Sequence, residues 1–169
     1  MQSEYRIGID PGTSSSPTSI AVVYFDVPTN TKTNEKDEVF ATYTILGTYS
    51  IQPVLFIDRM VSNVLIAESI GRIIEYFTQI ASKERAMIRV ALECPFLKGA
   101  AHDYMNQLLT FIKYFGTIDV MVNPKTVKKF MGSGSMEKED MAKALLEKPF
   151  DRKSINLINR LIVESKYDE

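Results

Sequence analysis

Two carboxylates in this sequence stand where they could share a metal ion. Asp10 closes the apolar run IGID, and Glu93 closes the run ALE. Oxygen ligands with no His or Cys beside them favour Mg²⁺ or Mn²⁺, which proteins hold with one or two carboxylates, waters and substrate phosphate. Two such ions could activate a water and stabilise the leaving oxygen in phosphodiester cleavage. A plainer alternative stays open, in which Asp10 caps its own turn and Glu93 is a solvated strand end.

A second group of residues could hold phosphate. The loop GSGS at 132–135 precedes an expected helix, and its backbone N–H groups and the hydroxyls of Ser133 and Ser135 could bind an anion. It is not a Walker loop, because no Gly-Lys-Ser/Thr follows at the required spacing. Alternatively, the loop is a flexible linker beside solvated charges. Between positions 125 and 138 only Glu137 opposes the lysines, which are Lys125, Lys128, Lys129 and Lys138.

The elements that must position these groups follow from the periodicity of apolar residues. Alternation and β-rich apolar runs predict strands, whereas apolar residues at steps of three and four predict helices. Polar residues 28–37 are expected to form a hairpin loop. The expected strands cover 5–10, 19–25, about 39–46, 88–93 and 118–122. The expected helices cover 60–81, 105–115, 136–146 and 155–162, and 124–130 is a Lys-rich turn or short helix.

The order of these elements predicts an α/β fold. Three strands with short connections make an antiparallel meander, and the later strand–helix–strand units add parallel strands beside it. The expected result is a mixed five-stranded sheet with helices on both faces. The first and fourth strands can be neighbours in such a sheet, so Asp10 and Glu93 are expected at one rim.

Length and composition limit the class of protein. The chain has 169 residues, 45% hydrophobic and 24% charged, which is the balance of one soluble globular domain. Cys94 is the only cysteine, so it builds neither a disulfide framework nor a zinc site, and a reducing compartment is expected. Neither a secretion signal nor the roughly 18 apolar residues of a membrane span is found. A cytoplasmic location is therefore expected.

The net charge of −1, from 20 Lys and Arg against 21 Asp and Glu, argues against a protein that binds nucleic acid with its whole surface. The charges are unevenly spread, however. Positions 123–153 hold eight basic and five acidic residues, whereas positions 1–60 hold four basic and seven acidic residues. A local cationic edge is therefore expected, with non-specific duplex binding that is weak without divalent metal and falls steeply with salt.

Three segments together resemble the successive motifs of the RuvC family of Holliday junction resolvases. They are IGIDPGT at 7–13, ALECPF at 91–96 and VKKFMGSGSMEK at 127–138, and their order and spacing match over roughly residues 5–148. The third motif is the most specific, because a bare ribonuclease H-like fold does not require it. The resemblance implies one ribonuclease H-like nuclease domain over 1–169, and the short length suits a diverged, phage-encoded member acting in a bacterial host cell.

The resemblance also implies catalytic roles. Asp10 and Glu93 would be catalytic acids that bind Mg²⁺, with Mn²⁺ as a substitute and two ions per site. Lys138 would match the active-site lysine of the family and steady the scissile phosphate or the attacking water. The implied activity is a crossover junction endodeoxyribonuclease that leaves 5′-phosphate and 3′-hydroxyl ends on branched DNA.

Further matches imply how DNA would be held. Phe96 falls where family members insert an aromatic residue at the junction crossover, although a core Phe is an equal alternative. The helix at 105–115 matches the one used in dimerisation, and a homodimer would put two sites on a two-fold substrate. The residues expected to grip the phosphate backbone are Lys125, Lys128, Lys129, Ser133 and Ser135.

The C-terminal end departs from the family pattern. Family members complete the metal site with Asp-x-x-Asp followed by an Ala-rich helix, whereas this sequence ends at Tyr167-Asp168-Glu169. Asp168 is the best candidate for the first acid of that pair, as a catalytic and metal-binding residue. The second acid and the helix behind it are then expected beyond the sequence given.

Two other functions stay open. The chain could be a catalytically incomplete junction-binding protein of the same fold. It could also be a fragment of an actin-like or sugar-kinase ATPase, whose first phosphate loop also reads Asp-x-Gly-Thr after a strand. Those ATPases need two such domains around the nucleotide, and this length supplies one.

Overall fold

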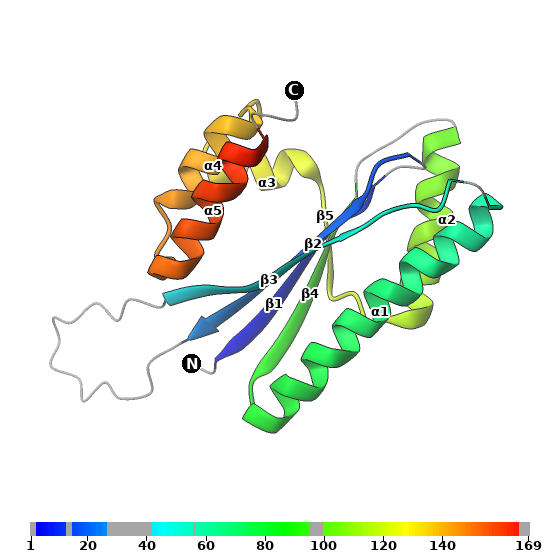
Figure 1. Cartoon of the computed structure of the whole chain (residues 1–169), viewed down its shortest axis with the longest axis horizontal. Coiled ribbons are helices and arrows are strands. Elements are labelled where there is room, and N and C mark those ends of the chain that lie inside the picture. Colours follow the sequence, from blue (N-terminus) through cyan, green and yellow to red (C-terminus); the bar gives the residue numbers. More distant parts are fainter. Residues whose placement is uncertain (1–2, 13–14, 27–41, 56, 95–99, 166–169) are drawn as a thin grey trace, which may run out of the picture.

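A computed structural model describes residues 3–12, 15–26, 42–55, 57–94 and 100–165. Its centre is a five-stranded sheet with the strand order β3-β2-β1-β4-β5 (Figure 1). The strands are β1 (Glu4–Asp10), β2 (Thr18–Asp26), β3 (Thr42–Ile51), β4 (Met87–Glu93) and β5 (Val120–Val122). The first three strands form an antiparallel meander, and β4 and β5 add parallel strands beside β1. This mixed sheet confirms the predicted ribonuclease H-like class.

One face of the sheet carries the hydrophobic core. The helices α1 (Arg59–Glu84) and α2 (Ala100–Phe115) cover this face (Figure 1). Alternate residues of the central strands point into it, because successive side chains of a strand face opposite ways. The buried residues contributed by β1 and β4 are Tyr5, Ile7, Ile9, Val90 and Leu92. The buried residues of the two helices include Ile66, Ile70, Ile74, Phe77, Leu108 and Ile112.

The two core helices approach each other closely at a pair of glycines. A Cβ on Gly71 would lie 2.7 Å from Cβ of Phe115, and a Cβ on Gly116 would lie 2.8 Å from Cδ1 of Ile74. Gly116 also donates its N–H to the carbonyl of Ile112 at 2.8 Å, where α2 ends. The helix therefore ends directly before Gly116, at the predicted last residue 115, and the missing side chain at Gly116 lets α1 and α2 approach closely.

The other face carries α3 (Pro124–Met131), α4 (Lys138–Leu146) and α5 (Arg152–Ser165). Asp151 fixes the start of α5 by accepting the N–H of Ser154 at 2.7 Å and the hydroxyl of Thr44 at 3.1 Å. The hydroxyl of the buried Ser154 accepts the N–H of Ile45 at 2.7 Å. These bonds tie α5 to the edge strand β3, so helices cover both faces of the sheet as predicted.

Several predicted boundaries differ from the observed ones. The third strand was expected over 39–46 but runs over Thr42–Ile51, and positions 39–41 lie outside the described residues. It is an edge strand with many exposed residues, and its pairing with β2 shifts register between Val22 and Val23, so alternation is weak. The last strand covers Val120–Val122 rather than 118–122. Asp119 donates its N–H to the carbonyl of Val90 at 2.9 Å, but its carboxylate, in place of a backbone carbonyl, accepts the N–H of Val90 at 2.6 Å.

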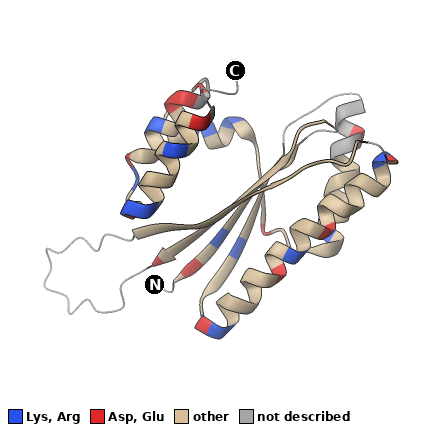
Figure 2. Cartoon of the chain, viewed as in Figure 1, with Lys and Arg blue, Asp and Glu red and all other residues tan. Residues whose placement is uncertain are grey.

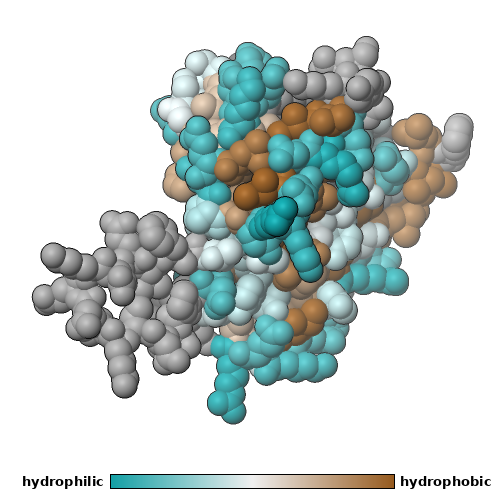
Figure 3. Space-filling model, turned by 60° about the vertical axis from the view of Figure 1, so that its left-hand side comes forward, coloured by the Kyte–Doolittle hydropathy of each residue, from teal (hydrophilic) through white to brown (hydrophobic). Residues whose placement is uncertain are grey.

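The surface is mixed in charge and hydropathy. Acidic and basic residues alternate along α1, whereas α3 carries lysines and no acid (Figure 2). On the face turned forward in Figure 3, hydrophobic areas lie between hydrophilic ones. No helix in the described part of the chain is long and apolar enough to cross a membrane.

Candidate functional site

Asp10 and Glu93 end two neighbouring parallel strands. Ile9 is registered opposite Leu92 in the last residue pair between β1 and β4, and each acid follows directly after it. Both side chains point away from the core, because Ile9 and Leu92 are buried on the opposite face. The structure therefore brings the two predicted acids together at one rim of the sheet.

The turn after β1 is tight and depends on a glycine. Gly12 donates its N–H to the hydroxyl of the buried Thr18 at 3.1 Å. A Cβ on Gly12 would lie 2.1 Å from the carbonyl oxygen of Ser16, so no other residue fits without moving the backbone. This bond closes the connection from β1 to β2 and fixes the backbone beside Asp10.

The two carboxylates interact electrostatically. Partial burial raises the pKa of Glu93 above its usual range, and the negative charge of Asp10 raises it further. The ammonium group of Lys128 acts in the opposite direction and lowers that pKa. Asp10 is exposed and Glu93 is half-buried. A cation bound between the two carboxylates would offset the charge of Asp10 that acts on Glu93.

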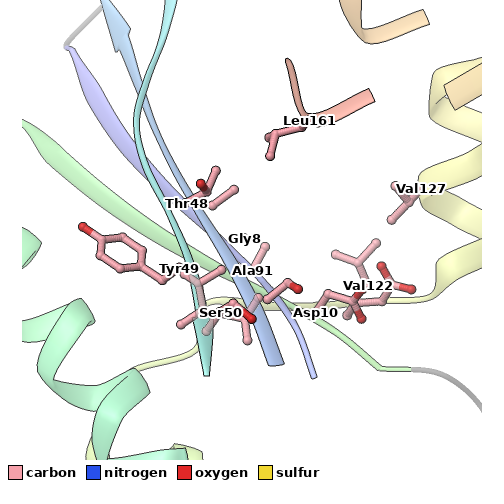
Figure 4. A pocket seen from close by; sticks show the side chains of 14 residues that line it. Gly8, Asp10, Thr48, Tyr49, Ser50, Ala91, Val122, Val127 and Leu161 are labelled. Carbon is pink, nitrogen blue, oxygen red and sulfur yellow. The ribbon is translucent and has the colours of Figure 1, made fainter. Parts of the chain in front are cut away.

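A cavity of about 580 Å³ opens beside these acids (Figure 4). Its floor is made of small residues in one row across the sheet, since Gly8 pairs with both Ala21 and Ala91. Val127 of α3 and Leu161 of α5 reach into it from the other side. The acids therefore lie in a concave site large enough for part of a substrate, with polar groups at one end and apolar walls.

A second cavity, of about 620 Å³, shares the same small-residue floor and extends along the sheet away from the acids. Arg6 and Arg89 line it and are registered opposite each other on β1 and β4. Both pair with the buried carboxylate of Glu4, at 2.5 Å and 3.4 Å from their Nε atoms. Because Glu4 offsets part of their charge, this end of the sheet is not a strong cationic site.

The predicted Lys-rich segment is a helix next to the acids. Asn123 caps α3 by accepting the N–H of Lys125 at 2.8 Å, and Pro124 supplies the fixed φ that suits a first helical residue. Lys128 is the lysine of this helix that acts on Glu93. Lys125 and Lys129 are exposed. The helix therefore places one cation at the acids and two toward solvent.

The glycine-serine loop folds back against α3. Gly132 ends the helix at φ 157°, and its N–H donates to the carbonyls of Lys128 and Lys129. A Cβ on Gly134 would lie 3.3 Å from the side chain of Lys129, so the loop packs along that lysine. The hydroxyls of Ser133 and Ser135 lie 3.1 Å apart and bond each other. Both serines remain exposed, and their use for phosphate stays a prediction.

Three other predicted site residues are not placed at the acids by the structure. Lys138 is the first residue of α4, and its side chain lies outside the described part of the chain. Phe96 and Asp168 also lie outside the described residues. Among the described residues, no group of three or more His, Cys, Asp or Glu could hold a metal ion.

The two acids nevertheless fit a divalent cation. They are hard oxygen donors, and Mg²⁺ is usually held by one or two carboxylates with waters and phosphate completing its shell. Sequence reasoning missed the neutral residues that line the site, among them Val127 and Leu161. Val127 stands in the quoted third motif, but nothing in the sequence showed which side of its helix meets the sheet. Leu161 could be found only once α5 was placed over the cavity.

Solved structures of a similar fold are known. No protein-family model and no curated protein matches the sequence. A structure of Thermus thermophilus RuvC is 15% identical, with a TM-score of 0.54 over 97% of this chain and 95% of that chain. T. thermophilus RuvC in complex with Holliday junction substrate is 16% identical, with a TM-score of 0.57 over 97% of this chain and 94% of that chain. The chain therefore has a RuvC-like fold.

Proposed function

We propose that this protein is a structure-selective DNA endonuclease that resolves Holliday or other branched junctions by divalent-metal-dependent phosphodiester hydrolysis. The observation that carries the proposal is the pair Asp10 and Glu93 on adjacent parallel strands, close enough for Asp10 to raise the pKa of Glu93. The RuvC-like fold supports it, since one solved structure of that fold is a complex with Holliday junction substrate. Cleavage would leave 5′-phosphate and 3′-hydroxyl ends.

Several residues of the chain would have separate roles in the reaction. Asp10 and Glu93 would hold Mg²⁺, with Mn²⁺ as a substitute, and two bound cations would supply the charge that activates water and stabilises the leaving oxygen. Lys128, next to Glu93, would bind a phosphate of the same strand. Lys138 and Asp168 are proposed to join the catalytic site.

Phosphate contacts outside the metal site complete the proposal. Lys125, Lys129, Ser133 and Ser135 are proposed to hold the DNA backbone beside the acids, and Phe96 is proposed to stack on an unpaired base. A homodimer would bring two such sites to a two-fold junction. Cleavage of both strands at symmetric positions is then expected.

The test is cleavage of a four-way junction and a matched linear duplex in Mg²⁺, Mn²⁺ and Ca²⁺. The wild-type protein should cut the junction in Mg²⁺ or Mn²⁺. Asp10→Asn should lower the cleavage rate by about 10²–10³-fold, the range found when a group that stabilises transition-state charge is removed. Junction binding by Asp10→Asn should persist. Glu75→Gln removes an exposed carboxylate on α1 and should leave the rate unchanged.

Two outcomes would contradict the nuclease proposal. If a chain extended past Glu169 binds junctions but never cuts them, the protein is a junction-binding member of the fold. If the protein binds no branched DNA and instead hydrolyses ATP, the actin-like alternative is right. Efficient cleavage by the 169-residue chain would show that no acid beyond Glu169 is needed.

A further inference from the structure

Phe130 is a large apolar side chain that the fold leaves in water. It is 81% exposed, although it lies in an ordered helix, α3, rather than in a loop. Leaving a Phe side chain exposed forgoes roughly 1.5–3 kcal/mol of burial energy. Neighbouring Met131 is half-buried, so the exposure of the ring is not shared by the whole end of the helix. The exposed ring is therefore a candidate contact for a ligand.

The position of Phe130 connects it to the acids. Val127 lines the cavity beside Asp10 and Glu93, and Phe130 follows it by three residues on the same helix. Side chains three apart share a helix face, so the ring lies about one turn, roughly 5 Å along the axis, beyond the cavity wall. A nucleic-acid strand that crosses the acids can therefore reach the ring.

The charges around the ring suit a nucleotide. The Nζ atom of Lys148 lies 5.8 Å from the centroid of the Phe130 ring, within cation–π distance. Lys129, which precedes Phe130 in the sequence, is exposed, and α3 contains no acid. An aromatic face offers stacking to a base, and the ammonium groups offer charge to its phosphate. The ring and the cations together match both parts of one nucleotide.

The ring is also held in place by the backbone. Gly132 ends α3 two residues after Phe130, and its N–H donates to the carbonyl of Lys128 at 3.1 Å. Phe130 thus belongs to a closed last turn of the helix. A Phe side chain has only two rotatable bonds, so ordering it against a base costs little conformational entropy.

We infer that Phe130 and Lys148 form a stacking site for an unpaired nucleobase of the bound DNA, next to the metal-binding acids. The inference rests on the proposed function, because it takes branched DNA as the ligand. The base must be unpaired or unstacked, since a side chain can stack only on an open base face. Such bases occur at a junction and are absent from a continuous duplex. The site therefore favours branched over linear DNA.

The test is binding of fluorescent DNA in Ca²⁺, with a four-way junction, a single strand and a linear duplex as separate probes. Phe130→Ala should weaken binding of the junction and the single strand by about tenfold, the scale of one lost stacked base. Binding of the duplex should stay unchanged. Phe130→Trp should keep the affinity, whereas Phe130→Leu should behave like Phe130→Ala, because Leu is apolar but cannot stack.

Lys148→Gln separates charge from stacking. The slope of the logarithm of the binding constant against the logarithm of the salt concentration should fall by about one in Lys148→Gln, because one ionic contact with phosphate is lost. Phe130→Ala should leave that slope unchanged. Tyr76→Ala removes an exposed aromatic residue from α1, on the opposite side of the sheet, and serves as the matched control. A thermal melt of each variant shows whether it is folded, and an exposed ring is not expected to affect folding.

The results separate the inference from the proposed function. If the wild-type protein binds and cuts junctions but Phe130→Ala binds all three probes like wild type, the stacking site is refuted and the nuclease stands. The same conclusion follows if Phe130→Leu retains full affinity, because an apolar contact would then suffice. If the wild-type protein binds no branched DNA, the proposed function itself fails.

Discussion

The two faces of the sheet use the same strands for different purposes. On β1 and β4, Ile9 and Leu92 point to α1 and α2 and are buried. The residues that follow them, Asp10 and Glu93, point to α3 and α5 and line a cavity. One face therefore holds the core, and the other holds the candidate site. The comparison teaches that the period of two within a strand can separate folding from function at neighbouring positions.

The largest difference between the faces should appear in a matched pair of truncations. Leu108 of α2 is fully buried, whereas Leu161 of α5 is 40% exposed. Leu108→Ala should lower the free energy of unfolding by about 2–5 kcal/mol, because it leaves a cavity in the packed core. Leu161→Ala should change it by no more than about 0.5 kcal/mol. Urea denaturation followed by circular dichroism measures both, and equal losses would refute the division between the faces.

A smaller effect should come from the cap that joins α5 to β3. Asp151→Ala should cost about 1 kcal/mol, the usual loss for a helix cap. The matched control is Asp58→Ala, which removes a similar cap from α1, where Asp58 accepts the N–H of Met60 at 2.8 Å. Hydrogen exchange should show α5 opening in Asp151→Ala while α1 and α2 stay protected. Loss of protection on both faces at once would contradict separate layers.

The same aspartate predicts a pH dependence. Hydrogen bonds from Ser154 are the main cause that lowers the pKa of Asp151 below its usual value, and the hydroxyl of Thr44 adds to the effect. The folded protein therefore binds the proton less tightly than the unfolded chain. Its contribution to stability is present above the unfolded pKa and is lost as the pH falls through the folded pKa. Exchange in α5 should accelerate in that acidic range, and Asp151→Asn should remove the change.

The smallest effect should be a gain in stability from Glu93→Gln, a change at the candidate site. Burial and Asp10 raise the pKa of Glu93, so ionised Glu93 disfavours the metal-free fold. The stability that protonated Glu93 provides is present below the unfolded pKa and is lost as the pH rises through the raised folded pKa. Glu93→Gln should therefore slightly raise the melting temperature at neutral pH in a chelating buffer.

Added Mg²⁺ completes the test of Glu93. It should raise the melting temperature of the wild-type protein, because a ligand that binds the native state stabilises it. Glu93→Gln should lose most of that response, whereas Glu75→Gln should keep it. If neither Mg²⁺ nor Mn²⁺ changes the melting temperature of the wild-type protein, that result would count against a metal site at the two acids.

The sequence predicted the parts of the fold that periodicity describes. Alternation in β1 and β4 identified their buried sides, and the strand order then placed Asp10 and Glu93 at one rim. The edge strand β3 was placed too early, since exposure on both sides removes the alternation that marks a strand. Periodicity shows which side of a strand or helix is buried, but it does not show where the ends of an exposed edge strand lie.

The candidate site was predicted less completely than the fold. Charged residues could be proposed from their types, which is how Lys128 was proposed before the structure showed that it acts on Glu93. The apolar residues Val127 and Leu161 could not, because an apolar residue on a helix looks the same whether it meets the core or a cavity. Phe130 was overlooked for a similar reason, since burial of an aromatic residue is the usual expectation and only the folded chain shows its exposure.

The parallel register of β1 and β4 has a consequence for sequence change. Backbone hydrogen bonds, which every residue except proline can donate and accept, bring the two acids to the same rim once Ile9 lies opposite Leu92. Most side chains of these strands can therefore be exchanged without moving Asp10 and Glu93 apart, provided that alternate positions stay apolar. A one-residue insertion or deletion inside either strand would instead turn its acid toward the core. The geometry of this rim thus tolerates substitutions far better than changes in strand length.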